Sequence, residues 1–247
     1  ALELQKSSFI RHISHELKTP LAAIREGTEL IYDNSVGPLN DEQQEICVII
    51  RDSVNRLQRH IEDLLDFNIV LDSTSLQDSE KVVLLPLLQS VIDDHKLDIK
   101  RKHLTINNKL QHVTLNSNVK QLRVILDNII ANAINYSNDS DSINIDGTLE
   151  HEQLTLRIAD QGPGIANELK EKVFDAFFQG PAPIDNQVKG SGLGLTIVKE
   201  LLMRLNGTIQ ILDVADYHLP ALSSEQQAHT TGTIVEITLP RVAKNDE

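Results

Sequence analysis

The sequence predicts an α + α/β fold, in which a helical hairpin domain precedes an α/β sandwich. Two stretches within residues 1–72 carry apolar side chains at helical spacing, and the chain beyond residue 80 alternates strand-like with helical runs. The polar segment between them lacks periodicity and is typical of a linker. A chain of 247 residues with 40% hydrophobic residues can form two cores. The predicted division is a first domain at 1–72, a linker at 73–80, a second domain at 81–241 and a disordered tail at 242–247.

The first predicted helix covers residues 7–31. Projected at about 100° per residue, its apolar side chains form one stripe, composed of Ile10, Ile13, Leu17, Leu21, Ile24 and Ile31. Pro20 cannot donate a hydrogen bond to the carbonyl of Glu16, so we expect it to interrupt and bend the helix. A polar break follows, composed of Asp33, Asn34, Gly37 and Pro38.

The second predicted helix begins after Asn40, which forms a capping-box pattern with Gln43. Steps of three and four residues then place apolar side chains along one seam, at Cys47, Ile50, Val54, Leu57, Ile61, Leu64 and Leu71, with Asn68 the exception. Because a lone hairpin leaves part of these stripes in water, we expect a homodimer through residues 1–72, packed as a four-helix bundle. Packing of the seam on the rest of the same chain is the alternative.

The second domain mixes strands and helices in the order of an α/β sandwich. The predicted strands are 104–107, 142–150, 154–160, 207–212 and 233–239, and the predicted helices are 85–100, 118–136 and 193–205. Residues 175–190 are rich in glycine and proline without periodicity, which predicts a mobile loop beside a site. Residues 214–231 form a second irregular stretch with no assigned purpose.

Composition excludes several classes of function. No run of about 18 apolar residues and no leader pattern is present, so we expect this segment to be soluble and intracellular. The single cysteine, Cys47, has no ligand-spaced neighbours, which argues against zinc or a disulfide and for a small core residue. A net charge of −13 without any Trp argues against direct nucleic-acid binding.

His15 is the first candidate catalytic residue. It lies roughly 160° from the apolar stripe on the projection, so we expect it to face solvent, together with His12 and Thr19. A neutral imidazole can attack a phosphoryl group, and the adjacent Glu16 can accept the other N–H and stabilise the cation. The alternative for Glu16 is an ordinary solvated helix charge.

Two asparagines and a tyrosine share one face of the predicted helix 118–136. Asn128 and Asn132 are four residues apart, and Tyr136 follows one turn later. Amide oxygens suit Mg²⁺, which bridges to phosphates. Alone, the pair could also be two surface or capping amides.

Two glycine-rich turns follow downstream. Asp160 ends a strand and opens Asp160-Gln161-Gly162-Pro163-Gly164-Ile165, where a carboxylate can accept a hydrogen bond from an adenine amino group. The second turn, 190–195, opens a helix whose backbone N–H groups can hold phosphate. Each turn alone is a weak signal, but the motifs in this order behind the His15 string predict an ATP site.

These strings resemble those of sensor histidine kinases. Residues 9–21, Phe-Ile-Arg-His-Ile-Ser-His-Glu-Leu-Lys-Thr-Pro-Leu, are similar to the family's H-box, and the later motifs resemble the N, G1 and G2 boxes of the ATP-binding fold shared with gyrase, Hsp90 and MutL. Residues 173–178 are similar to the F-box. The resemblance implies a mixed-sheet sandwich for the second domain. It also implies that His15 is the phosphoacceptor, assisted by Glu16, and that Thr19 helps water to dephosphorylate the partner protein.

The resemblance also assigns the ATP-site residues. Asn132 would ligate Mg²⁺, Asn128 would support metal or phosphate, Tyr136 would line the adenine and Asp160 would bind its amino group. The other expected nucleotide-binding residues are Gly162, Gly164, Phe174, Lys189, Gly190, Gly192, Leu193 and Gly194. Two positions that are often basic in the family are Asn135 and Gln179 here, and Lys189 is the candidate substitute unless it is merely solvated.

The implied function is ATP-dependent phosphorylation of His15 and transfer to an aspartate of a response regulator. The gyrase and Hsp90 branch has a glutamate at the Asn128 position, and an amide cannot be the base for ATP hydrolysis. A degenerate, nucleotide-binding scaffold is the other alternative. Residues 25–30 and 37–39 look similar to QseE-type (GlrK-type) sensors. That likeness implies a sigma-54-dependent activator as partner, and it predicts the cytoplasmic portion of a sensor anchored in a bacterial inner membrane.

Overall fold

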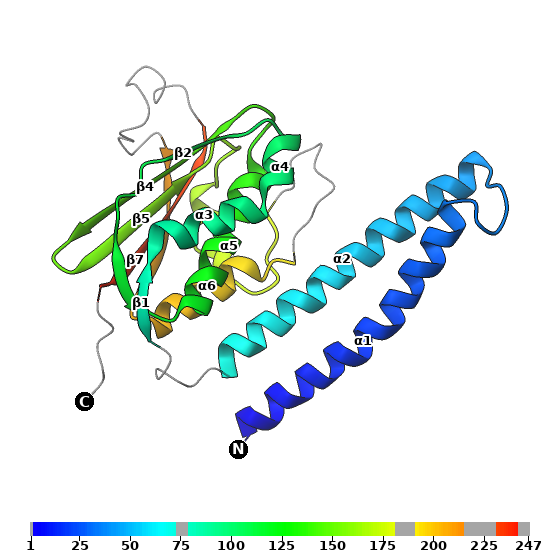
Figure 1. Cartoon of the computed structure of the whole chain (residues 1–247), viewed down its shortest axis with the longest axis horizontal. Helices are drawn as coiled ribbons and strands as arrows, with labels where there is room; N and C mark the ends of the chain where they lie inside the picture. Colours follow the sequence, from blue (N-terminus) through cyan, green and yellow to red (C-terminus); the bar gives the residue numbers. More distant parts are fainter. Residues whose placement is uncertain (1, 73–78, 181–190, 215–230, 242–247) are drawn as a thin grey trace. The chain divides into compact units, whose positions relative to one another are not determined.

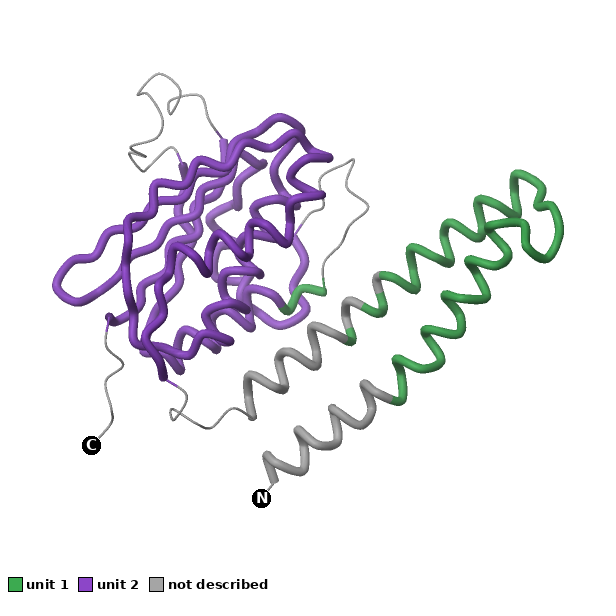
Figure 2. The backbone as a smooth tube through the Cα atoms, in the orientation of Figure 1, with its two compact units in different colours: residues 1–74, 189–193 green, residues 75–188, 194–247 purple. Residues whose placement is uncertain are grey.

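The chain forms two compact units in the computed structural model, which describes residues 2–72, 79–180, 191–214 and 231–241. One unit contains residues 1–74 together with 189–193, and the other contains 75–188 and 194–247 (Figure 2). The side chains of residues 2–15, of Arg56, Arg59 and His60, and of residues 62–72 also lie outside the description. In the part described, no helix is long and apolar enough to cross a membrane.

Two long antiparallel helices form the first unit (Figure 1). They are α1 (Leu2–Tyr32) and α2 (Asp41–Asp72). The predicted capping box at the start of α2 is confirmed, because Gln43 N donates to Asn40 Oδ1 at 2.8 Å and Asn40 N donates to Gln43 Oε1 at 3.0 Å. At the end of α1, the Arg51 guanidinium lies 4.5 Å from the centroid of the Tyr32 ring, which ties the two helices together near the turn.

The predicted seam divides into two rows. Leu21, Val54 and Ile61 form a buried cluster inside the hairpin, and Cys47 is buried as predicted for a small core residue. Ile50 and Leu57, on the alternate positions of the seam, remain exposed. α1 continues through Pro20, so the predicted interruption is wrong. A proline removes one hydrogen bond from a helix, and here the turns on both sides stay helical.

The second unit contains a five-stranded mixed sheet in the order β2-β4-β5-β7-β6. β2 pairs with β4 in parallel, and the other neighbours are antiparallel. A second, two-stranded sheet pairs β1 with β3. The strand bounds are β1 Glu80–Val83, β2 Thr105–Asn108, β3 Thr114–Ser117, β4 Ser142–Glu150, β5 Gln153–Ala159, β6 Thr208–Asp213 and β7 Thr233–Pro240.

Helices cover one face of this sheet (Figure 1). They are α3 (Leu84–Asp94), α4 (Lys96–Arg101), α5 (Val119–Tyr136) and α6 (Gly194–Arg204). Leu154, Leu156 and Ile158 alternate along β5 and are buried, as their period-two pattern predicts. The core of the unit therefore lies between the sheet and the helices, and α5 is fully buried along one side, at Ile125, Ile129 and Ile130 among others.

The predicted helix 85–100 is two helices rather than one. His95 lies at the break, where its side chain contacts Asp127 of α5 and its backbone N donates to the carbonyl of Ile92. The break between α3 and α4 therefore lies at a tertiary contact, which the local sequence pattern could not predict. Two short helices of the 3₁₀ type, at Asn167–Leu169 and Lys172–Phe174, follow β5.

Candidate active site

α5 presents the candidate amides beside its buried side. The Asn118 side chain caps its start, accepting from Lys120 N at 3.0 Å and Gln121 N at 3.1 Å. With the apolar side fixed in the core, Asn128 and Asn132 remain half-buried on a neighbouring side, and Tyr136 is exposed at the end of the helix. In the part of the chain that is described, the Asn132 amide makes no hydrogen bond. Its oxygen is the type of ligand that Mg²⁺ accepts.

Asn128 lies against the start of α6. A Cβ atom added to Gly194 would lie 2.6 Å from Asn128 Oδ1, closer than real atoms approach. The Asn128 amide nitrogen donates to the carbonyl of Val124 at 2.9 Å, which aims the oxygen toward Gly194. The structure therefore brings together two residues that the sequence places in separate motifs, and glycine at 194 is what permits the approach.

Asp160 is the buried acceptor of the site. The residue follows directly after β5 and is only 6% exposed. Its Oδ1 accepts hydrogen bonds from Gly162 N at 2.9 Å and from Thr233 N at 3.2 Å. Burial raises the pKa of Asp160 to about 6, and the two backbone hydrogen bonds oppose that rise. A carboxylate held this way is suited to accept from an adenine amino group.

The turn after Asp160 packs directly on the end of α5. A Cβ atom at Gly162 would lie 2.5 Å from the carbonyl oxygen of Tyr136 and 3.0 Å from Asp160 Oδ1. Gly164 adopts a φ of 77°, which favours glycine. The Gln161 side chain accepts from Ser142 N at 2.7 Å and from the Ser142 hydroxyl at 3.0 Å, fixing the turn to the start of β4. The structure thus brings Tyr136, Gly162 and Asp160 close together, and their roles toward a nucleotide stay predictions.

Gly232 and Thr233, which sequence reasoning missed, complete this corner. A Cβ atom at Gly232 would lie 2.1 Å from the carbonyl oxygen of Asp160. Thr233 is buried, and its carbonyl accepts from Asp160 N at 2.9 Å while its own N–H donates to the carboxylate. The available signal was a glycine at the entrance of an apolar strand, which marks close approach of two backbones.

The second glycine turn is partly described. Gly192 has a φ of 76°, and Leu193 N donates to the hydroxyl of Ser191 at 3.2 Å, so the turn leads into α6 with glycine at its left-handed position. The predicted residues Lys189 and Gly190 lie outside the described residues. Gly192 and Leu193 therefore remain predicted phosphate neighbours by position, and Gly194 has the contact with Asn128.

Phe174 is anchored on α6 rather than free in the following loop. It is buried, its carbonyl accepts from the Thr196 hydroxyl at 3.0 Å, and Lys199 Nζ lies 5.2 Å from the centroid of its ring. Three residues later Phe177 is 68% exposed with a φ of 66°, an unusual conformation for an aromatic residue. Phe174 therefore anchors residues 174–180 on α6, immediately before the undescribed residues 181–190.

Asp127 faces away from the candidate ATP site. Its carboxylate lies 2.8 Å from Nε2 of His95, and this hydrogen bond is the largest cause of a raised His95 pKa. Asp127 precedes Asn128 in the chain, but its carboxylate is directed to the junction of α3 and α4. It is therefore poorly placed to activate water beside the Asn128 and Gly194 contact.

The candidate phosphoacceptor lies on α1. His15 is within the helix, but its side chain is outside the described residues, so its predicted exposure stays a prediction. Glu16 and Thr19 are exposed. His15 belongs to the first unit, whereas Asn128, Asp160 and Gly194 belong to the second.

Two protein families match the chain. Residues 117–243 match the histidine kinase-, DNA gyrase B- and HSP90-like ATPases, and residues 5–69 match the His kinase A (phospho-acceptor) domain. The first match covers the described ATP-site residues from Asn128 to Thr233, and the second covers His15. The chain therefore belongs to the histidine kinase-, gyrase B- and HSP90-like ATPase family and, with the phospho-acceptor domain in front, to the sensor histidine kinases.

The chain is similar to particular members. It is 38% identical to the sensor histidine kinase GlrK of Escherichia coli K12 and 37% identical to the sensor histidine kinase QseE of E. coli O157:H7, in both cases over 86% of this chain and 44% of the relative. The chain thus spans less than half the length of these relatives. The resemblance to QseE/GlrK-type sensors is confirmed.

Solved structures share the fold. Full-length ShkA in complex with AMPPNP has a TM-score of 0.69 at 21% identity, over 97% of this chain and 47% of that one. The Acinetobacter baumannii histidine kinase AdeS has a TM-score of 0.60 at 21% identity, over 92% of this chain and 98% of that one. These likenesses confirm the predicted fold class, a helical hairpin followed by a mixed-sheet α/β domain.

Proposed function

We propose that this chain transfers the γ-phosphoryl group of ATP to His15 and then to an aspartate of a response regulator. The observation that carries the proposal is the buried Asp160 corner on the same chain as the His15 string. Asp160 with Tyr136 would receive the adenine, and the Asn128 and Gly194 contact at the start of α6 would lie at the phosphates. Histidine kinases are the class in which both parts occur together.

Asn132 is the proposed ligand of Mg²⁺, with Asn128 in support. The half-buried Asn132 amide fits a hard, oxygen-seeking ion that keeps several waters and also binds phosphate. When bound, Mg²⁺ would neutralise charge on the phosphoryl oxygens during transfer. Asn128 already donates to Val124, so its oxygen rather than its nitrogen is the atom available to a ligand.

The chemical step is an in-line displacement. A neutral imidazole nitrogen of His15 attacks the γ-phosphorus, the bond to the β,γ-bridging oxygen breaks, and ADP leaves with that electron pair. Glu16 would accept the second imidazole N–H and so hold the tautomer and stabilise the cation. Since Glu16 follows His15 directly in the chain and is itself exposed, it needs no other element of the fold for this role.

Labelling tests the proposal directly. The chain is incubated with γ-labelled ATP and Mg²⁺, and acid-labile protein label is expected. His15→Gln should abolish the label, whereas the matched control His12→Gln, one helical turn earlier on α1, should keep it. Label that persists in His15→Gln, or disappears equally in both variants, would contradict the assignment.

ATP hydrolysis is the second candidate and is disfavoured by geometry. Asn128 is not a base, and the Asp127 carboxylate is bound to His95. Phosphate release without labelled protein would favour hydrolysis. A nucleotide-binding scaffold without transfer would show ATP binding but neither label nor phosphate release.

The proposed partners are a second copy of the chain and a response regulator. The exposed row containing Ile50 and Leu57 supports dimerisation through residues 1–72 as a four-helix bundle. The similarity to GlrK and QseE supports a sigma-54-dependent activator as the regulator, and a cytoplasmic position within a membrane-anchored sensor. Transfer from labelled chain to the receiver domain of such an activator, but not to a receiver with its acceptor aspartate replaced, tests the partner.

Thr19 is proposed to assist the reverse activity, removal of phosphate from the regulator by water. It lies one turn after His15 on the exposed part of α1. Thr19→Ala should leave phosphorylation of His15 within about twofold and slow dephosphorylation of the regulator by about tenfold or more, because the attacking water loses a group that positions it. Equal loss of both activities would instead indicate a structural role.

A further inference from the structure

Lys102 binds the end of α5 with its whole ammonium group. Nζ donates to three backbone carbonyls, those of Ile134 at 2.8 Å, Asn135 at 2.9 Å and Ser137 at 2.9 Å. The residue follows α4, more than thirty positions earlier in the sequence, so this contact is tertiary. Three acceptors match the three protons of a lysine ammonium.

These bonds complete the hydrogen bonding of the last turn of α5. A helix leaves its final carbonyls without partners within the helix, and its C-terminal end carries partial negative charge. The carbonyl of Ala133 accepts from Ser137 N at 3.1 Å and from the Ser137 hydroxyl at 2.7 Å. Lys102 donates to the next two carbonyls, those of Ile134 and Asn135. The carbonyl of Tyr136 lies against Gly162. A cation at this position is therefore favourable both as donor and as charge.

The same turn of α5 is a wall of the Asp160 corner. In the sequence, Tyr136 lies between Asn135 and Ser137, two of the three residues whose carbonyls Lys102 binds. Its own carbonyl oxygen would lie 2.5 Å from a Cβ atom added to Gly162, the residue whose N–H donates to Asp160. The backbone of Lys102 also accepts from Ser140 N at 2.8 Å, which holds the chain where it leaves α5. Movement of this turn would therefore displace both Tyr136 and the turn that orients the carboxylate.

We propose that Lys102 is a positioning residue for adenine recognition, acting through the carbonyls of Ile134, Asn135 and Ser137 rather than by contact with the nucleotide. The inference rests on the proposed ATP binding. Selectivity for the base then depends in part on a lysine that belongs to none of the sequence motifs.

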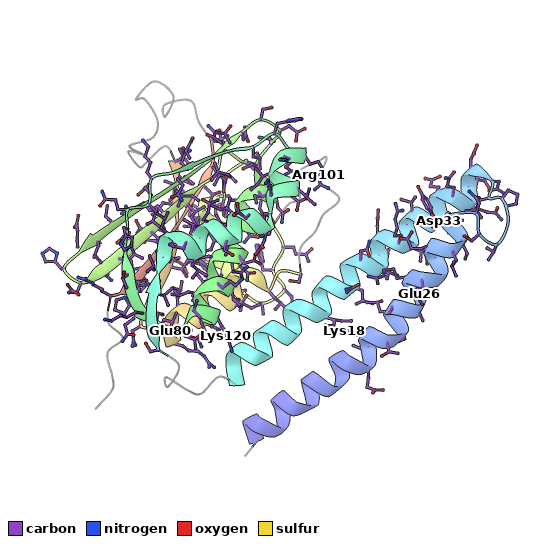
Figure 3. The ribbon with its side chains drawn as sticks, in the orientation of Figure 1. Lys18, Glu26, Asp33, Glu80, Arg101 and Lys120 are labelled. Carbon is purple, nitrogen blue, oxygen red and sulfur yellow. The ribbon has the colours of Figure 1, made fainter. Side chains whose placement is uncertain are left out.

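Nearby carboxylates offset only part of the effect of burial, and the pKa of Lys102 stays below its ordinary value. Burial lowers the pKa of Lys102, Asp139 and then Asp141 and Asp98 raise it, and Arg101 lowers it. Only the charged ammonium has three donors, so the observed geometry requires that form. Arg101 itself pairs with Asp98 at 2.8 Å on the exposed side of α4, and Figure 3 labels it at the end of that helix.

Selectivity between ATP and GTP tests the proposal. A carboxylate at Asp160 favours the amino group of adenine and repels the carbonyl oxygen that guanine carries in its place. Dissociation constants for both nucleotides are measured by calorimetry on the full chain and on Lys102→Met. The matched controls are Lys100→Met, on exposed α4, and Lys120→Met, which Figure 3 labels at the opposite end of α5.

ATP binding should weaken about tenfold in Lys102→Met, the loss expected for a charge-assisted set of hydrogen bonds, while GTP binding changes by less than about twofold. The preference for ATP then falls, and both controls keep it. An unchanged preference, with or without a lower melting temperature, overturns the proposal and leaves Lys102 a structural cap.

Lys102→Arg keeps the inference testable if the methionine variant does not fold. Its charge is retained, but a planar guanidinium cannot converge on three carbonyls as an ammonium does, so the ATP preference should be intermediate. Full wild-type preference in Lys102→Arg would then overturn the proposal. A wild-type chain that binds neither nucleotide would overturn the proposed function as well, which separates the two failures.

Discussion

The two units bury their apolar side chains to very different degrees. In the second unit the sheet and helices leave Ile125, Ile130 and Leu154 fully buried, and β5 alternates buried with less buried positions. In the hairpin, Leu21 and Val54 are buried but Ile24 and Leu57 are half-exposed on the same two helices. The second unit thus contains a complete core. In a single copy of the hairpin, one row of apolar side chains is buried between the helices and the other row is exposed to solvent.

This difference indicates how each unit is stabilised. A closed core has a free energy of unfolding that does not depend on protein concentration, whereas a hairpin completed by a second copy is stabilised by mass action. The division also fits the proposed chemistry, since the nucleotide corner around Asp160 needs a rigid frame while α1 and α2 must meet other proteins.

The largest expected effect comes from charging the exposed row of the hairpin. Leu57, 50% exposed on α2, and Met203, 52% exposed on α6, are equally accessible in one copy. Leu57→Glu should weaken dimerisation by about 100-fold or more, because several such side chains are buried together in a four-helix bundle. Met203→Glu should have no effect on it. Sedimentation analysis over a range of concentrations measures both.

Equal dimerisation of the two variants would contradict the proposed difference between the hairpin and the second unit. If Leu57→Glu stays dimeric, the exposed row is not the interface and the alternative, packing on the rest of the same chain, gains support. If Met203→Glu also dissociates, α6 contributes to the dimer and the second unit is not independent.

Truncation inside the two cores is the next effect. Leu156→Ala in β5 should lower the free energy of unfolding of the second unit by about 3 kcal/mol at every protein concentration, as expected for a fully buried leucine. Val54→Ala should lower hairpin stability less, and its melting temperature should rise with concentration. Calorimetric scans at two concentrations distinguish them. A concentration-dependent shift for Leu156→Ala would contradict the closed core.

The elements with local signals were predictable from sequence. Strand β4 has the predicted bounds, and the bounds of β5 and β7 differ from the predicted ones by one residue. The capping box of Asn40 and Gln43 is as expected. Both kinds of signal depend only on residues close together in the sequence. β1 and β3 were missed, since each has only four residues and is stabilised by pairing with a distant strand. The break between α3 and α4 depends likewise on the contact of His95 with Asp127.

The candidate site shows the same limit. Asp160 and Gly162 could be predicted because one short turn contains both the acceptor and the glycine that it requires. Thr233 and Lys102 could not, because their partners lie 73 and at least 32 residues away and no motif marks them. The roles of the site residues toward ATP remain predictions that the following measurement addresses.

Acidity should weaken ATP binding through Asp160, which has a pKa of about 6. At pH 5 about one carboxyl in ten is charged, so ATP affinity should fall by about tenfold between pH 7.5 and pH 5. Calorimetric titrations across this range measure it. Asp160→Asn should bind weakly with a flat profile, and Asp127→Asn should keep the wild-type profile. A profile without inflection near pH 6 would contradict the role of Asp160.

The stability of the second unit should change in the opposite direction. The folded state holds the Asp160 proton more tightly than the unfolded state, where the pKa is near its ordinary 3.8. The stabilising contribution is therefore complete below pH 3.8 and is lost as the pH rises through about 6. Urea unfolding at pH 5 and pH 7.5 should show this contribution in wild type and not in Asp160→Asn, after the common pH dependence is subtracted.

The smallest effect contrasts one substitution in the two units. Gly27 lies inside α1 with no atom within 4 Å of an added Cβ, so Gly27→Ala should stabilise the hairpin by about 0.5–1 kcal/mol through helix propensity. At Gly194 the added Cβ would meet Asn128 Oδ1 at 2.6 Å, so Gly194→Ala should instead weaken ATP binding severalfold. Thermal scans and nucleotide titrations of both variants measure the contrast. If Gly27→Ala lowers the melting temperature and weakens dimerisation, the space beside Gly27 is occupied by the second copy, and the interface then extends along α1 as well as α2.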